Sequence, residues 1–101
     1  MFEQKNVSRD EVMLVVAGSL SGERTTEFHR HMEDLVAVGS RVITLNLAKT
    51  ESINSSALGK ILLFRKKLSE QDRILQIKGC SESLYKTFQM IKFDTLISIQ
   101  R

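Results

Sequence analysis

The sequence predicts a single α/β domain in which helices pack against a mixed, largely parallel sheet of four to five strands. Short apolar segments rich in β-branched residues alternate with longer segments whose apolar residues recur at helical spacing. Crossovers of this kind place successive strands parallel in one sheet. The chain has 101 residues, 42% hydrophobic and 27% charged, so residues 1–101 are expected to form one domain.

Three segments carry the strand pattern most strongly, and two more are expected to extend the sheet. The run Val-Met-Leu-Val-Val-Ala at residues 12–17 is short, β-branched and closed by Gly18. The expected strands are residues 2–7 (an edge strand), 12–17, 41–47, 73–78 and 95–100. Residues 48–54 are expected to form the loop that leads into a helix.

The first and third predicted helices are bounded by capping residues. Ser21 suits the N-cap of the first helix, and Gly39 suits its C-terminal stop. Its apolar stripe is Phe28, Met32, Leu35 and Val36. The third helix is expected to use Ser81 or Ser83 as its cap. Its stripe is Leu84, Phe88 and Ile91.

The second predicted helix runs from Ser56 or Ala57 to Glu70. Its expected core stripe is Leu58, Ile61, Leu62 and Leu68. Leu63 falls nearly opposite this stripe, on the side of Ser56 and Lys60. An exposed leucine is ordinary on any surface, and beside a candidate site it is also a candidate contact; the two interpretations are about equally supported.

Composition and charge exclude several classes of function. The net charge is +3 with both signs interspersed, which does not favour a nucleic-acid surface. Cys80 is the only cysteine, and His29 and His31 point to different faces of one helix, so neither a disulfide nor a metal site is predicted. No apolar run approaches the roughly 20 residues of a membrane span, and no cofactor motif is present, so a cytoplasmic protein without membrane insertion is expected.

Ser55 and Ser56 stand side by side where an apolar strand gives way to a helix. The ordinary explanation is a helix cap, because a serine oxygen accepts a free N–H of the first turn. A nucleophilic serine would need a nearby base and oxyanion donors. The segment lacks Gly-x-Ser-x-Gly and a phosphate-loop frame, and nothing places the histidines beside it. An enzyme is therefore not expected.

Modification of the serine pair is the physically favoured functional hypothesis. A phosphoryl group adds roughly −1.5 to −2 charges. The free amides and the dipole at a helix N-terminus can accommodate that anion without melting the helix. A flat contact with a partner at this place would nevertheless be lost, because the new charge would have to be desolvated.

The motif around these serines resembles the STAS domain of anti-sigma-factor antagonists. Residues 42–47, Val-Ile-Thr-Leu-Asn-Leu, match the family's Val-x-Leu-Asp/Asn-Leu strand. Residues 53–59, Ile-Asn-Ser-Ser-Ala-Leu-Gly, match its Asp-Ser-Ser/Thr-Gly-Leu-Gly turn and helix start. Residues 18–21, Gly-Ser-Leu-Ser, occupy the place of Gly-x-Leu/Ile-Asp. The order of strands and helices is similar across nearly the whole chain.

The resemblance implies a reversible switch. Such proteins bind a GHKL-type serine kinase that doubles as an anti-sigma factor, which frees the sigma factor for transcription. Phosphorylation of the serine after the motif Asp ends the interaction, and a PP2C-type phosphatase reverses it. By position, Ser55 is the implied phosphoacceptor. The implied partner-binding residues are Leu20, Ser21, Asn54, Ser56, Ala57, Leu58, Gly59, Lys60 and Leu63.

Three departures from the family pattern change the charge and the backbone of this region. Asn54 and Ser21 each replace a family Asp, which removes two negative charges from the same end of the sheet. Ala57 replaces a family Gly, so no positive φ is expected there. An alternative function is a non-enzymatic STAS scaffold or accessory subunit, in a signalling complex or at the cytosolic side of a lipid-transport assembly.

Overall fold

The computed structural model describes residues 2–101 and has five strands and three α-helices in that range. The elements in chain order are β1 (Phe2–Asn6), β2 (Glu11–Leu20), α1 (Glu23–Val38), β3 (Val42–Ile53), α2 (Ser55–Ser69), β4 (Ile74–Lys78), α3 (Glu82–Met90), a 3₁₀ turn η1 (Phe93–Thr95) and β5 (Ser98–Gln100). They form the predicted mixed sheet.

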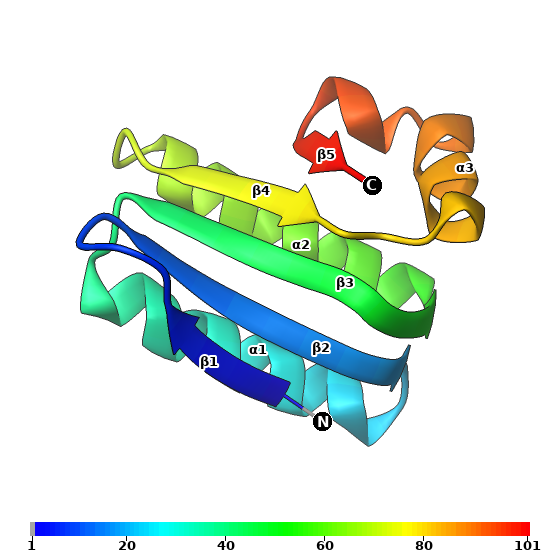
Figure 1. Ribbon diagram of the computed structural model, residues 1–101, viewed down its shortest axis with the longest axis horizontal. Coiled ribbons are helices and arrows are strands. Elements are labelled where there is room, and N and C mark those ends of the chain that lie inside the picture. Colours follow the sequence, from blue (N-terminus) through cyan, green and yellow to red (C-terminus); the bar gives the residue numbers. More distant parts are fainter. Residues whose placement is uncertain (1) are drawn as a thin grey trace.

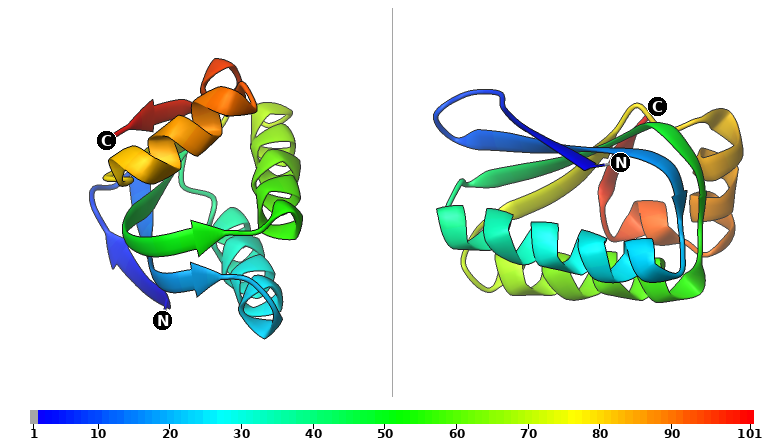
Figure 2. Two further views of the ribbon diagram at one scale, coloured as in Figure 1. Left: turned by 90° about the vertical axis from the view of Figure 1, so that its right-hand side faces the viewer. Right: turned by 90° about the horizontal axis from the view of Figure 1, so that it is seen from below.

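The sheet order follows the chain, β1-β2-β3-β4-β5. Only the β1–β2 pair is antiparallel, as expected for an edge hairpin, and the other three pairs are parallel. Helices α1 and α2 lie side by side on one face, and α3 packs beyond the end of β4 (Figures 1 and 2). No helix of the described chain covers the opposite face of β1 to β3, which the ribbon in Figure 1 presents to the viewer.

The open face is polar because hydrogen-bonded side chains cross it. Thr44 is buried, donates to a carboxylate oxygen of Glu11 at 2.7 Å and accepts from the Gln76 amide at 2.9 Å. These contacts join β2, β3 and β4. The covered face holds the hydrophobic core, where Leu14, Leu45 and Phe28 are among the fully buried side chains.

The strands that lead to the site are longer than predicted. The stretch expected to be a loop at residues 48–54 continues β3 up to Ile53, and β2 passes through Gly18 to Leu20. Register shifts between the two strands accommodate this extension. The extension is polar, so it lacks the apolar signal of a strand. It is nonetheless anchored because the buried Thr50 hydroxyl donates to the Val16 carbonyl at 2.8 Å.

Two predictions for α1 and α3 need correction. Ser21 is not the N-cap of α1, because the helix begins at Glu23 after Gly22, whose φ is 59°. Gly39 does end α1 in the left-handed conformation. In α3, Ser81 caps the first turn as predicted, but Ile91 lies beyond the helix and is 49% exposed. Phe93, which was not predicted, is 2% exposed and lies in the core instead of Ile91.

The core stripe of α2 is rotated relative to the prediction. The fully buried or nearly buried residues are Ala57, Ile61, Phe64 and Leu68, at spacings of four, three and four. The predicted Leu58 and Leu62 are half-buried and pack against the edge of the core. The rotation turns Leu63 outward, with 43% of its surface exposed, as predicted.

Candidate functional site

The candidate site lies where β2 and β3 end side by side and α2 begins. Parallel pairing aligns Ser19 with Ser52 and Leu20 with Ile53. The Asn54 amide then donates to the Leu20 carbonyl at 3.1 Å. The two segments that carry the family motif are therefore joined by main-chain hydrogen bonds, although more than 30 residues separate them in the chain.

Asn54 caps α2, and the two serines do not. Its backbone is extended (φ −84°, ψ 170°) and its side-chain oxygen accepts the Ala57 amide at 2.8 Å. The Leu58 amide donates to the Asn54 carbonyl at 3.1 Å. The ordinary explanation of the serine pair as a cap is therefore wrong, because the preceding asparagine satisfies the first turn.

Ser55 and Ser56 are the first two residues of α2, and both are exposed. Within residues 2–101, neither their hydroxyls nor their backbone amides form a hydrogen bond. No acidic side chain lies in the first turn of α2. The positive end of the helix dipole therefore meets solvent next to two free hydroxyls, an arrangement that favours an added anion.

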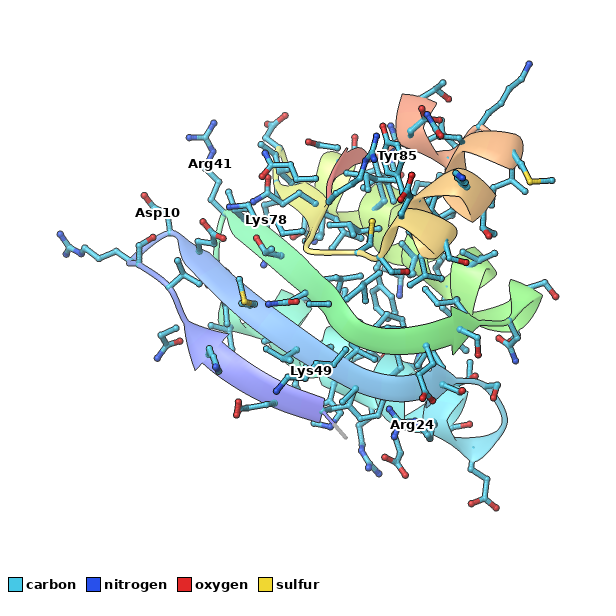
Figure 3. All side chains as sticks on the ribbon, turned by 45° about the vertical axis from the view of Figure 1, so that its right-hand side comes forward. Asp10, Arg24, Arg41, Lys49, Lys78 and Tyr85 are labelled. Atoms are coloured by element: carbon cyan, nitrogen blue, oxygen red, sulfur yellow. The ribbon has the colours of Figure 1, made fainter. Side chains whose placement is uncertain are left out.

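Arg24 places a further positive charge beside the end of β2. Figure 3 shows it at the start of α1, below β2. Its guanidinium donates to the Ala17 carbonyl and lies 5.0 Å from the centre of the Phe2 ring. Gly18, with φ +85°, lies next to this guanidinium. Arg24 could not be predicted from the sequence, because nothing in a helix start indicates a side chain that folds back under the preceding strand.

Lys60 links α2 to α1 one helical turn after Ser56. Its ammonium nitrogen lies 3.4 Å from Nδ1 of His29. The other ring nitrogen of His29 lies 3.3 Å from Glu33, and the ring centre lies 5.1 Å from that of Phe64. The His29 ring therefore lies between the Lys60 ammonium group and the Glu33 carboxylate. The Lys60 charge is thus held on the same side of α2 as Ser56.

The residues expected to meet a partner differ in accessibility. Exposed residues are Ser21, Ser55, Ser56, Gly59 and Leu63, and half-buried ones are Asn54, Leu58 and Lys60. Leu20 and Ala57 are fully buried, so their side chains present no surface. Ala57 also has no positive φ, as expected from its replacement of the family glycine.

Catalytic and metal-binding arrangements are not seen among the described residues. No group of three or more His, Cys, Asp or Glu side chains is placed to hold a metal ion in residues 2–101. Both ring nitrogens of His29 face Lys60 and Glu33, not a serine. Burial raises the pKa of the Cys80 thiol, which makes it a poor nucleophile. No helix in residues 2–101 is both long and apolar enough to cross a membrane.

Comparison with known proteins identifies the class. The profile of the family described as "Mlab, STAS domain" matches residues 4–98. The fold is a small α/β domain with the five-stranded mixed sheet and three helices of STAS structures. The chain therefore belongs to the STAS domain family. No curated protein sequence shows a significant match.

Solved structures with this fold include anti-sigma factor antagonists. A candidate antagonist from Thermotoga maritima superposes with a TM-score of 0.89 at 25% identity, over 99% of this chain and 86% of that one. The phosphorylated form of the Bacillus cell fate determinant SpoIIAA gives 0.76 at 18% identity, over 98% and 90%. A sulfate transporter family protein from Wolinella succinogenes gives 0.77 at 15% identity, over 95% and 80%.

Proposed function

We propose that this STAS domain is an anti-sigma-factor antagonist that works as a reversible, non-enzymatic binding switch in the cytoplasm. Ser55 is the phosphoacceptor, a GHKL-type serine kinase that is also an anti-sigma factor is the partner, and a PP2C-type phosphatase resets the switch. The observation that carries the proposal is the exposed Ser55 hydroxyl at the start of α2, which the Asn54 cap leaves without a structural role.

The surface around Ser55 supports a contact that a phosphate would break. Gly59 and Leu63 are exposed and lie four residues apart on one face of α2. Lys60, half-buried on the same helix, and the exposed Ser21, which follows the Leu20 hydrogen-bonded to Asn54, add polar groups to this end of the domain. Such a surface can bind a partner while Ser55 is neutral. A phosphate would bring roughly −1.5 to −2 charges into this contact, and the cost of desolvating them would oppose binding.

Two features support phosphorylation without loss of the fold. The unbonded amides of Ser55 and Ser56 can donate to phosphate oxygens. With Asn54 and Ser21 in place of the family's aspartates, two nearby negative charges that would repel the phosphate are missing. The solved phosphorylated form of SpoIIAA is a precedent for this fold with the modification in place.

The direct test is incubation of the protein with a GHKL-type serine kinase and ATP, followed by mass spectrometry of the intact chain. We expect a gain of one phosphate, which Ser55→Ala abolishes and Ser56→Ala preserves. A phosphate carried by Ser56 alone would move the assignment by one residue. Ser55→Asp should weaken kinase binding, and retained affinity would contradict a charge-driven switch.

A constitutive accessory subunit is the second candidate function. It is supported by the similar STAS structure from a sulfate transporter family protein and by the loss of both family aspartates near Ser55. This function predicts stable co-purification with a partner that is not a kinase, and equal binding before and after phosphatase treatment. Ser55→Ala and Ser55→Asp variants would then bind that partner alike.

A further inference from the structure

A pocket of about 200 Å³ lies at the end of α2 opposite to Ser55. It is lined by Arg65, Ser69, Arg73, Ile74, Leu75, Leu96 and Ser98. Arg65 and Ser69 share one face of α2 because they are four residues apart. Since α2 rises about 1.5 Å per residue, this pocket is on the order of 20 Å from the candidate site and is separate from it.

The pocket carries positive charge that no carboxylate neutralises. Its lining includes two arginines and no acidic residue. Arg65 donates from Nε to the Leu96 carbonyl at 2.8 Å, and within the described chain its other guanidinium nitrogens have no hydrogen-bond partner. Neither Arg65 nor Arg73 forms a salt bridge in residues 2–101. Uncompensated cations in a hollow favour an anion as their counter-charge.

Arg73 adds a second positive charge to the lining, and its guanidinium is fixed in place by main-chain and side-chain acceptors. Nε donates to the Ser40 carbonyl at 2.8 Å, and Nη1 donates to the Val36 carbonyl at 3.0 Å and to the Gln71 side-chain oxygen at 2.8 Å, which holds the side chain against the end of α1. Nη2 is buried and has no partner among the described residues. Arg73 therefore offers the pocket its charge, while the free donors that an oxyanion could reach belong to Arg65.

The rim of the pocket is apolar. Ile74 is 45% exposed and Leu96 is 46% exposed, two of the few large hydrophobic side chains that face solvent in the described chain. Leu75 lies beneath them, nearly buried. Apolar walls beside guanidinium groups suit a ligand with a short hydrocarbon part as well as a negative group, and they give a bare inorganic ion nothing to contact.

We propose that this pocket binds a small organic oxyanion, either a phosphate monoester or a carboxylate that carries a short apolar chain. The free guanidinium nitrogens of Arg65 would bind the oxyanion with charge-assisted hydrogen bonds, the charge of Arg73 would attract it, and the hydroxyls of Ser69 and Ser98 would add neutral donors. The hydrocarbon part would cover Leu96 and Ile74. This binding site is independent of the Ser55 switch.

The test is a titration of the isotope-labelled protein, followed by amide NMR shifts, with butyl phosphate, pentanoate and inorganic phosphate at constant ionic strength. We expect saturable shifts at Ser69, Ile74, Leu96 and Ser98 with at least one organic probe. The organic probe that binds more tightly shows whether the natural ligand is a phosphate monoester or a carboxylate. Burial of two methylene groups should make the organic probe about tenfold tighter than inorganic phosphate.

Matched variants separate this site from general anion attraction. Arg65→Gln should weaken binding of the organic probe about tenfold, because a charge-assisted hydrogen bond is lost. Arg30→Gln, at an exposed position on α1, should leave binding unchanged. Leu96→Ser should abolish the preference for the organic probe while its amide shifts report a folded domain. Shifts that never saturate, spread over all cationic residues or survive Arg65→Gln would overturn the proposal.

Discussion

The side-chain oxygen of Asn54 lies 2.8 Å from the backbone nitrogen of Ala57 and closes the first turn of α2. Capping and modification are therefore assigned to different residues. A serine that capped the helix would lose that hydrogen bond on phosphorylation, and the helix start would be disturbed. Because Asn54 provides the cap, the hydroxyl of Ser55 can change its chemistry while the backbone of α2 stays in place.

The cap should contribute measurably to stability. Asn54→Ala removes the acceptor of the Ala57 amide and is expected to lower the free energy of unfolding by about 1 kcal/mol, measured by urea denaturation. Asn54→Asp keeps the acceptor and places a negative charge at the helix start, so it should be at least as stable. Ser56→Ala, the control, should stay within about 0.5 kcal/mol. An unchanged Asn54→Ala would show that the cap is not stabilising.

Two glycines near the site should respond in opposite directions to the same substitution. Gly59 lies inside α2 with open space around an added Cβ, so Gly59→Ala should stabilise the domain by about 1 kcal/mol. Gly18 has φ +85° beside Arg24, so Gly18→Ala should destabilise it by roughly 1–2 kcal/mol. Thermal unfolding of the two variants measures both changes. Equal effects would contradict the backbone assignment.

Neighbouring residues on α2 should separate folding from binding. Phe64 is 1% exposed, so Phe64→Ala should cost about 3–5 kcal/mol of stability, a large part of the total for a domain of this size. Leu63 is 43% exposed, and Leu63→Ala should change stability by less than about 0.5 kcal/mol. If Leu63 contacts the proposed kinase, Leu63→Ala should weaken kinase binding, measured by calorimetry, without changing the stability of the domain. Unchanged binding would leave it an ordinary surface leucine.

The elements with strong apolar patterns could be predicted from the sequence, and the polar ones could not. The strand at residues 12–17 and the stripe of Phe28, Met32 and Leu35 were confirmed because burial of apolar side chains determines both. The polar second half of β3 was missed, since pairing with β2 holds it in place. Tertiary contacts of this kind leave no local signal.

The site itself was predictable only in part for the same reason. The neighbouring positions of Ser55 and Ser56 follow from the chain, and their exposure agrees with the modification hypothesis. Contacts between Lys60 and His29, 31 residues apart, depend on how α1 and α2 pack. Leu20 looked like a loop residue because Gly18 suggested the end of a strand, and the longer β2 places it in the core.

Cys80 should couple stability to alkaline pH. Burial raises the pKa of its thiol, an effect that its own backbone hydrogen bond and the charge of Arg101 partly oppose. Because the folded state then holds the thiol proton to higher pH than the unfolded chain does, this contribution to stability is fully present below the unfolded pKa. It is lost as pH rises through the folded pKa.

The measurement is urea denaturation of the parent protein and Cys80→Ala at several pH values between neutral and strongly alkaline. The stability of the parent should fall more steeply with pH than that of the variant, since other groups titrate equally in both. Alkylation of Cys80 in the folded protein should also be slow and should accelerate on unfolding, because the thiol is buried. Rapid alkylation of the folded protein, or parallel pH profiles, would contradict a shielded thiol.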